Sequence, residues 1–264
     1  MTPFLRKIIV KFKAQIVKFR LRSRGDKVFA GVPASGMGKE EVIKKISEVP
    51  FWWHSIDVGY GIQTPGHHGD IRHPTGDKNI LKNMQLPENL QGKRVLDIGA
   101  WDGFYSFEAE KRGASYVLAI DNFYRDKLEK TGSQGFEVAK EILNSKVEFK
   151  KAGVYELSPE KFGMFNAVLF LGVFYLLQHP ILALKKIYSV TKEILIMETH
   201  YDPYHGGKKT PLAMFYEGSE IGGNPTVWWG FNEACLHSVL RSVGFKNPQT
   251  LYSYADRIII KAYK

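Results

Sequence analysis

The sequence predicts an α/β fold built on a mostly parallel β-sheet with helices on both faces. Apolar runs alternate with helical stretches from Lys93 onward, which is the pattern of βα units in a parallel sheet. Several of these runs are apolar almost throughout, as expected of strands that are buried on both faces. The chain has 264 residues, of which 44% are hydrophobic and 24% charged. This composition is typical of a globular protein with a proper core.

Residues 1–30 are expected to form a basic amphipathic leader. Seven apolar residues recur between cations at spacings of one, three and four, the pattern of an amphipathic helix. Residues 1–27 hold nine Lys or Arg and one acid, so they account for +8 of the net charge of +10 and leave +2 for the rest. Three roles stay open for the leader: packing on the body, docking on an anionic membrane surface, or binding RNA.

Residues 31–92 are expected to form an N-terminal cap that contains an active-site loop. A helix is predicted over 39–48, and Pro50 stops it. From Phe51 to Asp77 the chain is rich in aromatics, histidines and glycines without sustained periodicity, which predicts a structured loop. Loops of this length in compact chains are often lids or binding loops.

Residues 93–264 are expected to form the domain that carries the sheet. Strands are predicted over 94–98, 116–120, 147–150, 165–171 and 193–197, and helices over 104–112, 134–143 and 180–190. A helix over 232–243 follows, ended by Gly244. Two β-like runs, 249–254 and 257–263, are close enough in sequence to pair as a hairpin.

The most specific signal is the stretch RVLDIGAWDGFYSFEAEKRGA, residues 94–114. A strand runs into Asp97, Gly99 and Gly103 form a tight turn, and a helix follows, so backbone can approach a ligand at the carboxyl end of the strand. A dinucleotide site needs G-x-G-x-x-G, whereas this turn reads G-A-W-D-G. An acid within the strand repels a pyrophosphate but suits an ammonium group, which favours S-adenosylmethionine (SAM) over NAD.

A second acid, Asp121, ends the next predicted strand, 24 residues after Asp97. At that position a carboxylate can accept hydrogen bonds from both ribose hydroxyls of a nucleoside. Either acid alone is equally compatible with a helix cap or a loop. The two together, at strand ends with this turn, indicate a cofactor site.

Residues 93–200 resemble the class I SAM-dependent methyltransferases, whose first motif is commonly D-x-G-x-G-x-G. The chain matches the motif at Asp97, Gly99 and Gly103 and has Trp101 at the middle glycine. The resemblance implies a Rossmann-like, seven-stranded sheet with a C-terminal β-hairpin, SAM as cofactor and S-adenosylhomocysteine (SAH) as product. It also implies a set of cofactor-binding residues: Asp97, Gly99, Ala100 and Gly103 at the methionine part, Asp121 and Asn122 at the ribose, Gly153 and Val154 at the adenine, and Leu171 and Gly172 at the sulfonium.

Two further stretches, FLGVFYLLQHPILAL (170–184) and WWGFNEACLHSVLRSVGF (228–245), look like the enzymes that finish wobble-uridine 5-oxyacetic acid in tRNA. Cytosolic bacterial members of that family transfer a carboxymethyl group from carboxy-SAM. Tyr175 matches the tyrosine that helps to hold the extra carboxylate. The lysine partner is replaced around Trp53–His54, and the loop with the arginine partner is expected to be missing between Tyr254 and Arg257. Because a buried carboxylate needs such partners, plain SAM and methyl transfer are expected.

The candidate catalytic residues are His54, Tyr175 and His200. His54 lies in the aromatic loop expected to close over the cofactor, and His200 follows the fifth strand of the sheet. A general base is needed only when the acceptor must lose a proton. Each histidine alone is equally open to a structural role, as are His67, His68, His73, His179 and His205.

Aromatic side chains are expected to form the acceptor pocket, with Trp53, Tyr216, Trp228 and Trp229 as substrate-binding residues. Such rings stack on planar groups or enclose a methylated ammonium. The cluster of His67, His68, Asp70 and His73 lacks a helix to set metal-ligand geometry. No metal is therefore expected.

The leading hypothesis is a methyltransferase that acts on an O or N atom of a small-molecule, glycan or lipid-linked acceptor. A tRNA wobble-uridine methyl or carboxymethyl transferase is the alternative, disfavoured because the body carries only +2. A non-catalytic SAM-binding partner protein is a third hypothesis. One cysteine and no apolar run of membrane-spanning length predict a cytoplasmic protein, with the leader as a means of docking at the inner membrane face.

Overall fold

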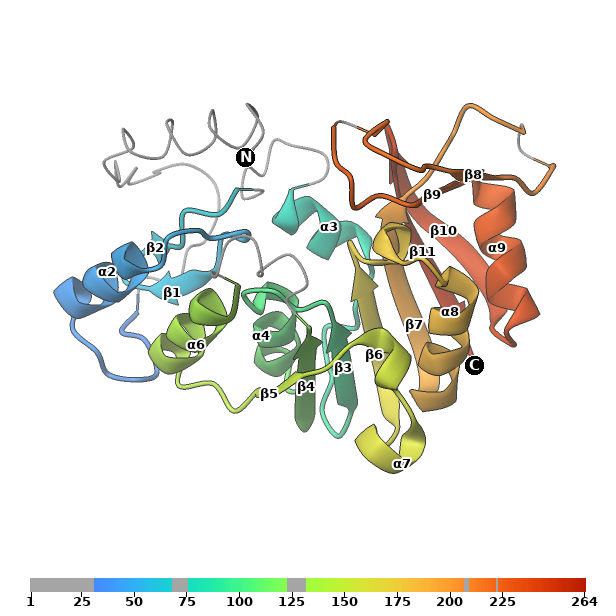
Figure 1. Ribbon diagram of the computed structural model, residues 1–264. Coiled ribbons are helices and arrows are strands. Elements are labelled where there is room, and N and C mark those ends of the chain that lie inside the picture. The colour runs from blue at the N-terminus through green and yellow to red at the C-terminus, as the bar shows by residue number, and fades with distance from the viewer. Residues whose placement is uncertain (1–30, 68–75, 123–131, 207–208, 222) are drawn as a thin grey trace.

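The computed structural model describes residues 31–67, 76–122, 132–206, 209–221 and 223–264, and a seven-stranded sheet is its central element (Figure 1). Five neighbouring strands are parallel, and the two C-terminal strands are antiparallel. This confirms the predicted sheet and its terminal hairpin. In spatial order the strands are β10 (Lys246–Tyr254), β11 (Arg257–Tyr263), β7 (Thr191–His200), β6 (Phe165–Leu171), β3 (Arg94–Ile98), β4 (Tyr116–Asp121) and β5 (Glu148–Lys151).

Both faces of the sheet are buried under helices, as expected for parallel strands. Successive side chains of a strand point to opposite faces, so Val95 joins one hydrophobic cluster and Leu96 the other. The first cluster includes α2 (Lys39–Glu48), α4 (Phe104–Lys111) and α6 (Gly132–Leu143). The second includes α7 (Pro159–Phe162), α8 (Pro180–Val190) and α9 (Glu233–Ser242).

The strand order reverses direction at β3. The chain proceeds from β3 through β4 to β5 at one edge, then returns to β6 on the other side of β3. Loops that follow β3 and β6 therefore leave the sheet in opposite directions. Open α/β sheets bind ligands in the crevice at such a switch point, at the carboxyl ends of the strands.

The loop predicted over 51–77 contains regular structure that the sequence pattern did not reveal. β1 (Asp57–Gly59) and β2 (Ile62–Gln63) form a short hairpin, and α3 (Asp77–Asn83) begins at the end of the segment. A second short antiparallel pair, which the sequence pattern also did not reveal, is formed by β8 (Ala213–Phe215) and β9 (Trp229–Phe231). Strands of two or three residues are too short to show a period of two.

The predicted leader, residues 1–30, lies outside the described residues, as do His68, Asp70 and His73. Its proposed roles stay predictions. Among the helices of the described ranges, none has both the length and the apolar character required to cross a membrane.

Candidate active site

A cavity of about 810 Å³ lies at the switch point of the sheet. The carboxyl ends of β3, β4 and β6 form its floor, and the cap and the β10–β11 turn contribute to its walls. The cavity brings together most of the predicted site residues: Trp53, His54, Asp97, Gly99, Asp121, Asn122, Gly153, Val154, Leu171, Gly172, Tyr175 and Trp228. Five predicted residues do not line it: Ala100, Gly103, His200, Tyr216 and Trp229.

The turn between β3 and α4 depends on two glycines, as the motif predicts. Gly99 has φ +77°, and a Cβ there would overlap the side chain of Val173 in the loop after β6. Gly103 has φ +88°, and a Cβ there would lie 2.7 Å from the rings of Phe107 and Phe136. Gly99 thus brings backbone to the cavity, whereas Gly103 serves the packing of α4.

Asp97 supplies a buried carboxylate at the end of β3. Its Oδ2 accepts a hydrogen bond from Ser106 Oγ of α4 at 2.6 Å. Burial raises the pKa of Asp97 to about 6, although the bond from Ser106 and the charge of His54 oppose this shift. A carboxylate with this much uncompensated charge at a cavity wall is suited to bind a cationic group.

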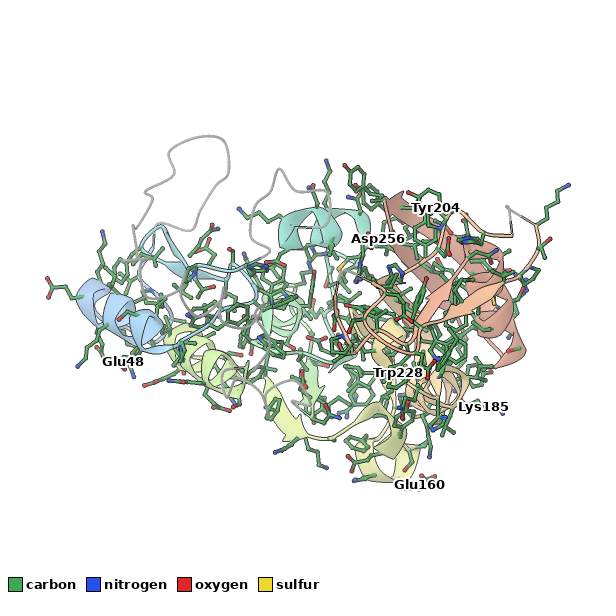
Figure 2. The ribbon with its side chains drawn as sticks, turned by 45° about the horizontal axis from the view of Figure 1, so that its top comes forward. Glu48, Glu160, Lys185, Tyr204, Trp228 and Asp256 are labelled. Atoms are coloured by element: carbon green, nitrogen blue, oxygen red, sulfur yellow. The ribbon has the colours of Figure 1, made fainter. Side chains whose placement is uncertain are left out.

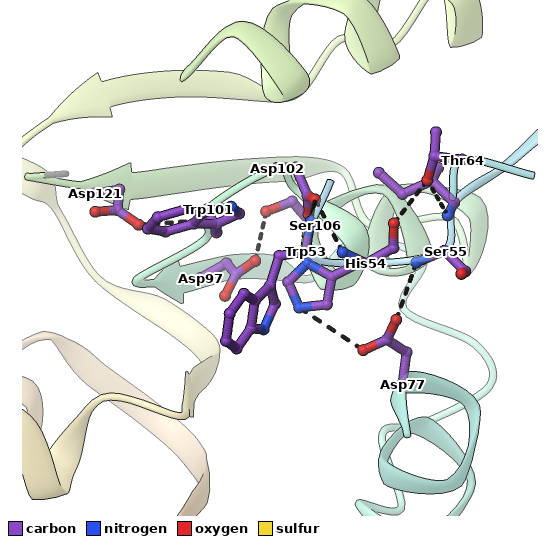
Figure 3. Close-up of polar contacts among 11 residues, drawn as sticks. Trp53, His54, Ser55, Thr64, Asp77, Asp97, Trp101, Asp102, Ser106 and Asp121 are labelled. Carbon is purple, nitrogen blue, oxygen red and sulfur yellow. Dashed lines mark hydrogen bonds and ion pairs between the residues drawn. The ribbon is translucent and has the colours of Figure 1, made fainter. Parts of the chain in front are cut away.

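Asp121 ends β4 beside Asp97's strand and also lines the cavity. The backbone N–H of Trp101 donates to Asp121 Oδ2 at 3.0 Å (Figure 3). Trp101 has φ +49° at the place of the middle glycine of the motif. The turn and the second strand end are therefore joined through one backbone hydrogen bond.

Tyr175 lies against an arginine, although the loop that carries the arginine partner in the resembling family was expected to be missing. Arg257, at the start of β11, lines the cavity with its guanidinium carbon 4.8 Å from the centroid of the Tyr175 ring. Only two residues separate β10 from β11, and this short turn carries Arg257 to its position beside Tyr175. Glu198 of β7 binds Arg257 through two contacts of 2.5 Å. Burial opposes the charged form of Arg257, but the charge of Glu198 outweighs burial and raises the pKa of Arg257 above its usual value, so the guanidinium stays charged.

His54, predicted as a general base, is buried between two carboxylates. Its Nδ1 is hydrogen-bonded to Asp102, and its Nε2 lies 3.9 Å from Asp77 Oδ1 (Figure 3). Burial alone would lower the pKa of His54, but the charges of Asp102 and Asp77 raise it to about 9. At neutral pH the ring is therefore a cation and has no lone pair available to accept a proton.

His200 is buried at the end of β7 but does not line the cavity. Its Nδ1 lies 3.1 Å from Asp256 Oδ2, and its buried Nε2 has no hydrogen-bond partner among the described residues. Asp256 itself lines the cavity, and the hydrogen bond from His200 holds its pKa below the usual range. His200 therefore reaches the cavity only through Asp256, and its predicted catalytic role stays a prediction.

The predicted aromatic pocket is divided between the cavity and its surroundings. Trp53 and Trp228 line the cavity, whereas Tyr216 and Trp229 pack behind it. Phe215, about half exposed, contacts both Trp228 and Trp229 at centroid distances of 6.0 and 5.0 Å. Figure 2 shows Trp228 and Asp256 in the half built by the C-terminal strands, opposite Glu48 of α2.

No group of three metal-ligating side chains occurs within the ranges that the structure covers. His67, the described member of the predicted His/Asp cluster, has its ring 5.8 Å from Trp53. The other members lie outside those ranges, so the absence of a metal stays a prediction.

Sequence reasoning missed several charged residues of the site: Asp77, Asp102, Glu198 and Asp256. Asp102 stands within the turn motif G-A-W-D-G and could have been noticed there. The others lie far apart in sequence and meet only through the fold, so no local pattern marks them.

Solved structures of SAM-dependent methyltransferases are similar to this chain in fold. No protein-family model matches the chain. The N-terminal domain of EvdMO1, solved in the presence of SAH and D-fucose, superposes with a TM-score of 0.63 at 19% identity, covering 87% of this chain and 98% of that one. A putative SAM-dependent methyltransferase from Listeria monocytogenes gives a TM-score of 0.50 at 20% identity, covering 70% and 95%. The class I methyltransferase fold predicted from the motif is thereby confirmed.

Curated relatives by sequence are named tRNA U34 carboxymethyltransferase, as the resemblance predicted. The protein of that name from Campylobacter hominis is 33% identical over 111 residues, which are 42% of this chain and 35% of that protein. The one from Cellvibrio japonicus is 27% identical over 168 residues, 62% and 48% of the two chains. The chain thus matches half or less of the length of these relatives.

The ionised His54 predicts a specific dependence of stability on pH. The pKa is about 9 in the folded chain against 6.5 for an ordinary histidine. Its contribution to the free energy of unfolding is thus complete below about pH 6.5 and is lost as the pH rises through 9, by up to about 3 kcal/mol. Urea unfolding at several pH values should show this loss in the wild type and not in His54→Gln. Equal slopes for both proteins between pH 6.5 and 9 would contradict it.

Proposed function

We propose that the chain binds SAM in this cavity and transfers its methyl group to an uncharged or cationic small-molecule or glycan acceptor. The observation that supports this most directly is the placement of Asp97 and Asp121 at the ends of adjacent parallel strands, on the two sides of a glycine turn. A dinucleotide site would place a pyrophosphate where Asp97 stands. Its carboxylate would repel that group.

The residues present fit SAM in three respects. The carboxylate of Asp97 is buried at the cavity and lacks a full counter-charge, as an ammonium group requires. Asp121 is oriented by the Trp101 N–H at the position suited to ribose hydroxyls. Gly99, with φ +77°, brings backbone to the cavity wall, and Gly153 and Val154 line the cavity where the adenine is expected.

Bound SAM supplies a methyl group on a positively charged sulfur, which an acceptor atom displaces in line. The chain contributes positioning, which alone can account for a large share of the rate of such a reaction. Leu171 and Gly172 form the wall at the end of β6, and Tyr175 and Trp228 extend it toward the acceptor side. Asp256, held by His200, is a lining carboxylate that can accept a hydrogen bond from the acceptor and so orient it.

The charges of the cavity wall support an acceptor without negative charge. Among the described residues the wall carries five carboxylates: Asp77, Asp97, Asp121, Glu198 and Asp256. Arg257 and the protonated His54 compensate only part of this charge. A phosphate-rich acceptor would be repelled, whereas a sugar, an alcohol or an amine would not. The D-fucose present with the EvdMO1 domain supports a sugar as one such acceptor.

The tRNA wobble uridine is the second candidate acceptor, because relatives of the chain carry that name. The contact of Arg257 with Tyr175 also favours a carboxylated donor. Glu198 opposes it, because this carboxylate already occupies the guanidinium through two contacts. Binding of another carboxylate would have to displace Glu198 within a buried site, which is costly.

Ionisation of Asp97 predicts how SAH affinity depends on pH. Only the charged carboxylate pairs with an ammonium group. The affinity for SAH should therefore be highest at neutral pH and fall as the pH drops through about 6, by up to about tenfold per pH unit. Titration calorimetry should show this limb in the wild type and a weak, flat profile in Asp97→Asn. Glu88→Ala, at an exposed acid away from the cavity, serves as the control. An affinity that stays constant from pH 7 to 4.5 would remove Asp97 from the binding site.

Donor and acceptor are tested together with labelled SAM. We expect label from the methyl group to appear in the small-molecule or glycan fraction of a cell extract and not in tRNA. SAM should bind at least about tenfold more tightly than carboxy-SAM, and Glu198→Gln should reduce this preference by freeing Arg257. Labelled tRNA, with tRNA binding that weakens steeply with salt, would establish the second candidate instead. SAH binding without any labelled acceptor would indicate a non-catalytic SAM-binding protein.

A further inference from the structure

Three segments that are distant in sequence meet at the ring of His54. His54 belongs to the cap loop, defined here as residues 51–67, Asp77 begins α3, and Asp102 lies in the β3–α4 turn. The imidazole stands between the two carboxylates, with Asp102 at Nδ1 and Asp77 toward Nε2 (Figure 3). Its face stacks on Phe104 at 5.7 Å and 17°.

The same two carboxylates also bind the backbone of the cap loop. Asp102 Oδ2 accepts hydrogen bonds from the N–H groups of Trp53 at 2.8 Å and His54 at 3.0 Å. Asp77 Oδ2 accepts one from the N–H of Ser55 at 3.0 Å. Three successive residues of the loop are therefore fixed by charged acceptors, and bonds of this kind are stronger than those between neutral groups.

Burial makes this arrangement dependent on all three charges. Asp102 is fully buried, Asp77 is 3% exposed and His54 is 7% exposed. A buried carboxylate without a cation carries a large desolvation cost. The positive ring of His54 therefore stabilises both carboxylates in the positions from which they bind the loop.

The fixed loop residues form part of the cavity wall. Trp53 and His54 both line the cavity. The ring of Trp53 lies 6.1 Å from that of Trp101, whose backbone N–H orients Asp121. Movement of the cap loop would thus remove Trp53 from its place beside the residues that receive the donor.

We propose that Asp77 and Asp102 are positioning residues which, together with His54 between them, form a clamp that holds the cap loop and keeps Trp53 over the donor side of the cavity. This inference rests on the proposed function for the identity of the donor. The clamp itself, which consists of Asp77, His54 and Asp102 with their bonds to the cap loop, exists in the free protein. Neither acid needs to touch the donor. Their effect is to fix a wall of the site and so to reduce the ordering that binding requires.

The charged groups around His54 give the clamp a characteristic pH dependence. Facing the ring are Asp102 from the turn, Asp77 from α3, Asp97 from β3 and Tyr105 from α4, whose ring edge lies 5.6 Å away. All three acids favour the charged imidazole. The clamp should therefore weaken when His54 loses its proton at alkaline pH, at the opposite end of the range from the titration of Asp97.

Hydrogen exchange of the free, full-length chain tests the clamp without any ligand. In Asp102→Asn and in His54→Gln we expect the amides of Trp53 and His54 to exchange at least about tenfold faster than in the wild type. Amides of β3 and β6 serve as the internal reference. His237→Gln is the matched control, because this histidine of α9 is hydrogen-bonded to Thr250 of β10 and does not line the cavity. Unchanged exchange in both clamp variants would overturn the proposal, and Asp77→Asn replaces Asp102→Asn if that variant does not fold.

SAH binding then tests what the clamp is for. We expect the clamp variants to bind SAH at least about tenfold more weakly at pH 7.5. Between pH 8 and 10 the ammonium group of SAH loses its proton and weakens binding in every variant, so His54→Gln should show a smaller alkaline fall in affinity than the wild type. Faster exchange combined with wild-type affinity would show that the clamp does not serve the donor site. If the wild type binds no SAH at all, the proposed function fails, while the exchange data still decide whether the carboxylates hold the loop.

Discussion

The turn between β3 and α4 is the constraint on which the rest of the site depends. Positive φ angles at Gly99, Trp101 and Gly103 reverse the chain within five residues. This reversal leaves Asp97 at the strand end, directs the Trp101 N–H to Asp121, and turns Asp102 toward the cap loop. One local backbone conformation therefore connects the proposed donor site on one side with the cap on the other. A side chain at Gly99 would disturb both, because it would overlap Val173.

The charged groups around the cavity fall into two classes. Some are paired with an opposite charge of the protein, whereas Asp97 forms no ion pair within the described residues and is available to a ligand. His54 is taken up by Asp77 and Asp102, and Arg257 by Glu198. Asp97 keeps a raised pKa, since the Ser106 hydroxyl compensates only part of its burial. The two histidines predicted as catalytic residues, His54 and His200, are thus each hydrogen-bonded to a carboxylate, whereas we propose that the carboxylate of Asp97 binds the cationic part of the donor.

The sequence was sufficient to predict the sheet, its terminal hairpin and the acids at the ends of β3 and β4, because long apolar runs and a glycine turn are local signals. It was insufficient for β1, β2, β8 and β9, whose two or three residues carry no period. The roles of His54 and Arg257 also escaped prediction. The charge and the contacts of each side chain depend on carboxylates that are 23 or more residues away in sequence, such as Asp77 and Glu198. Only the folded chain brings these groups together.

Calorimetric titration with SAH and with NAD tests the central claim most directly, in the wild type and in Asp121→Ala. The account predicts that one equivalent of SAH binds the wild type, that NAD does not bind, and that Asp121→Ala weakens SAH by about tenfold or more through loss of hydrogen bonds to the ribose. Binding of NAD without binding of SAH would contradict the assignment of the cavity. So would an affinity for SAH that Asp121→Ala leaves unchanged.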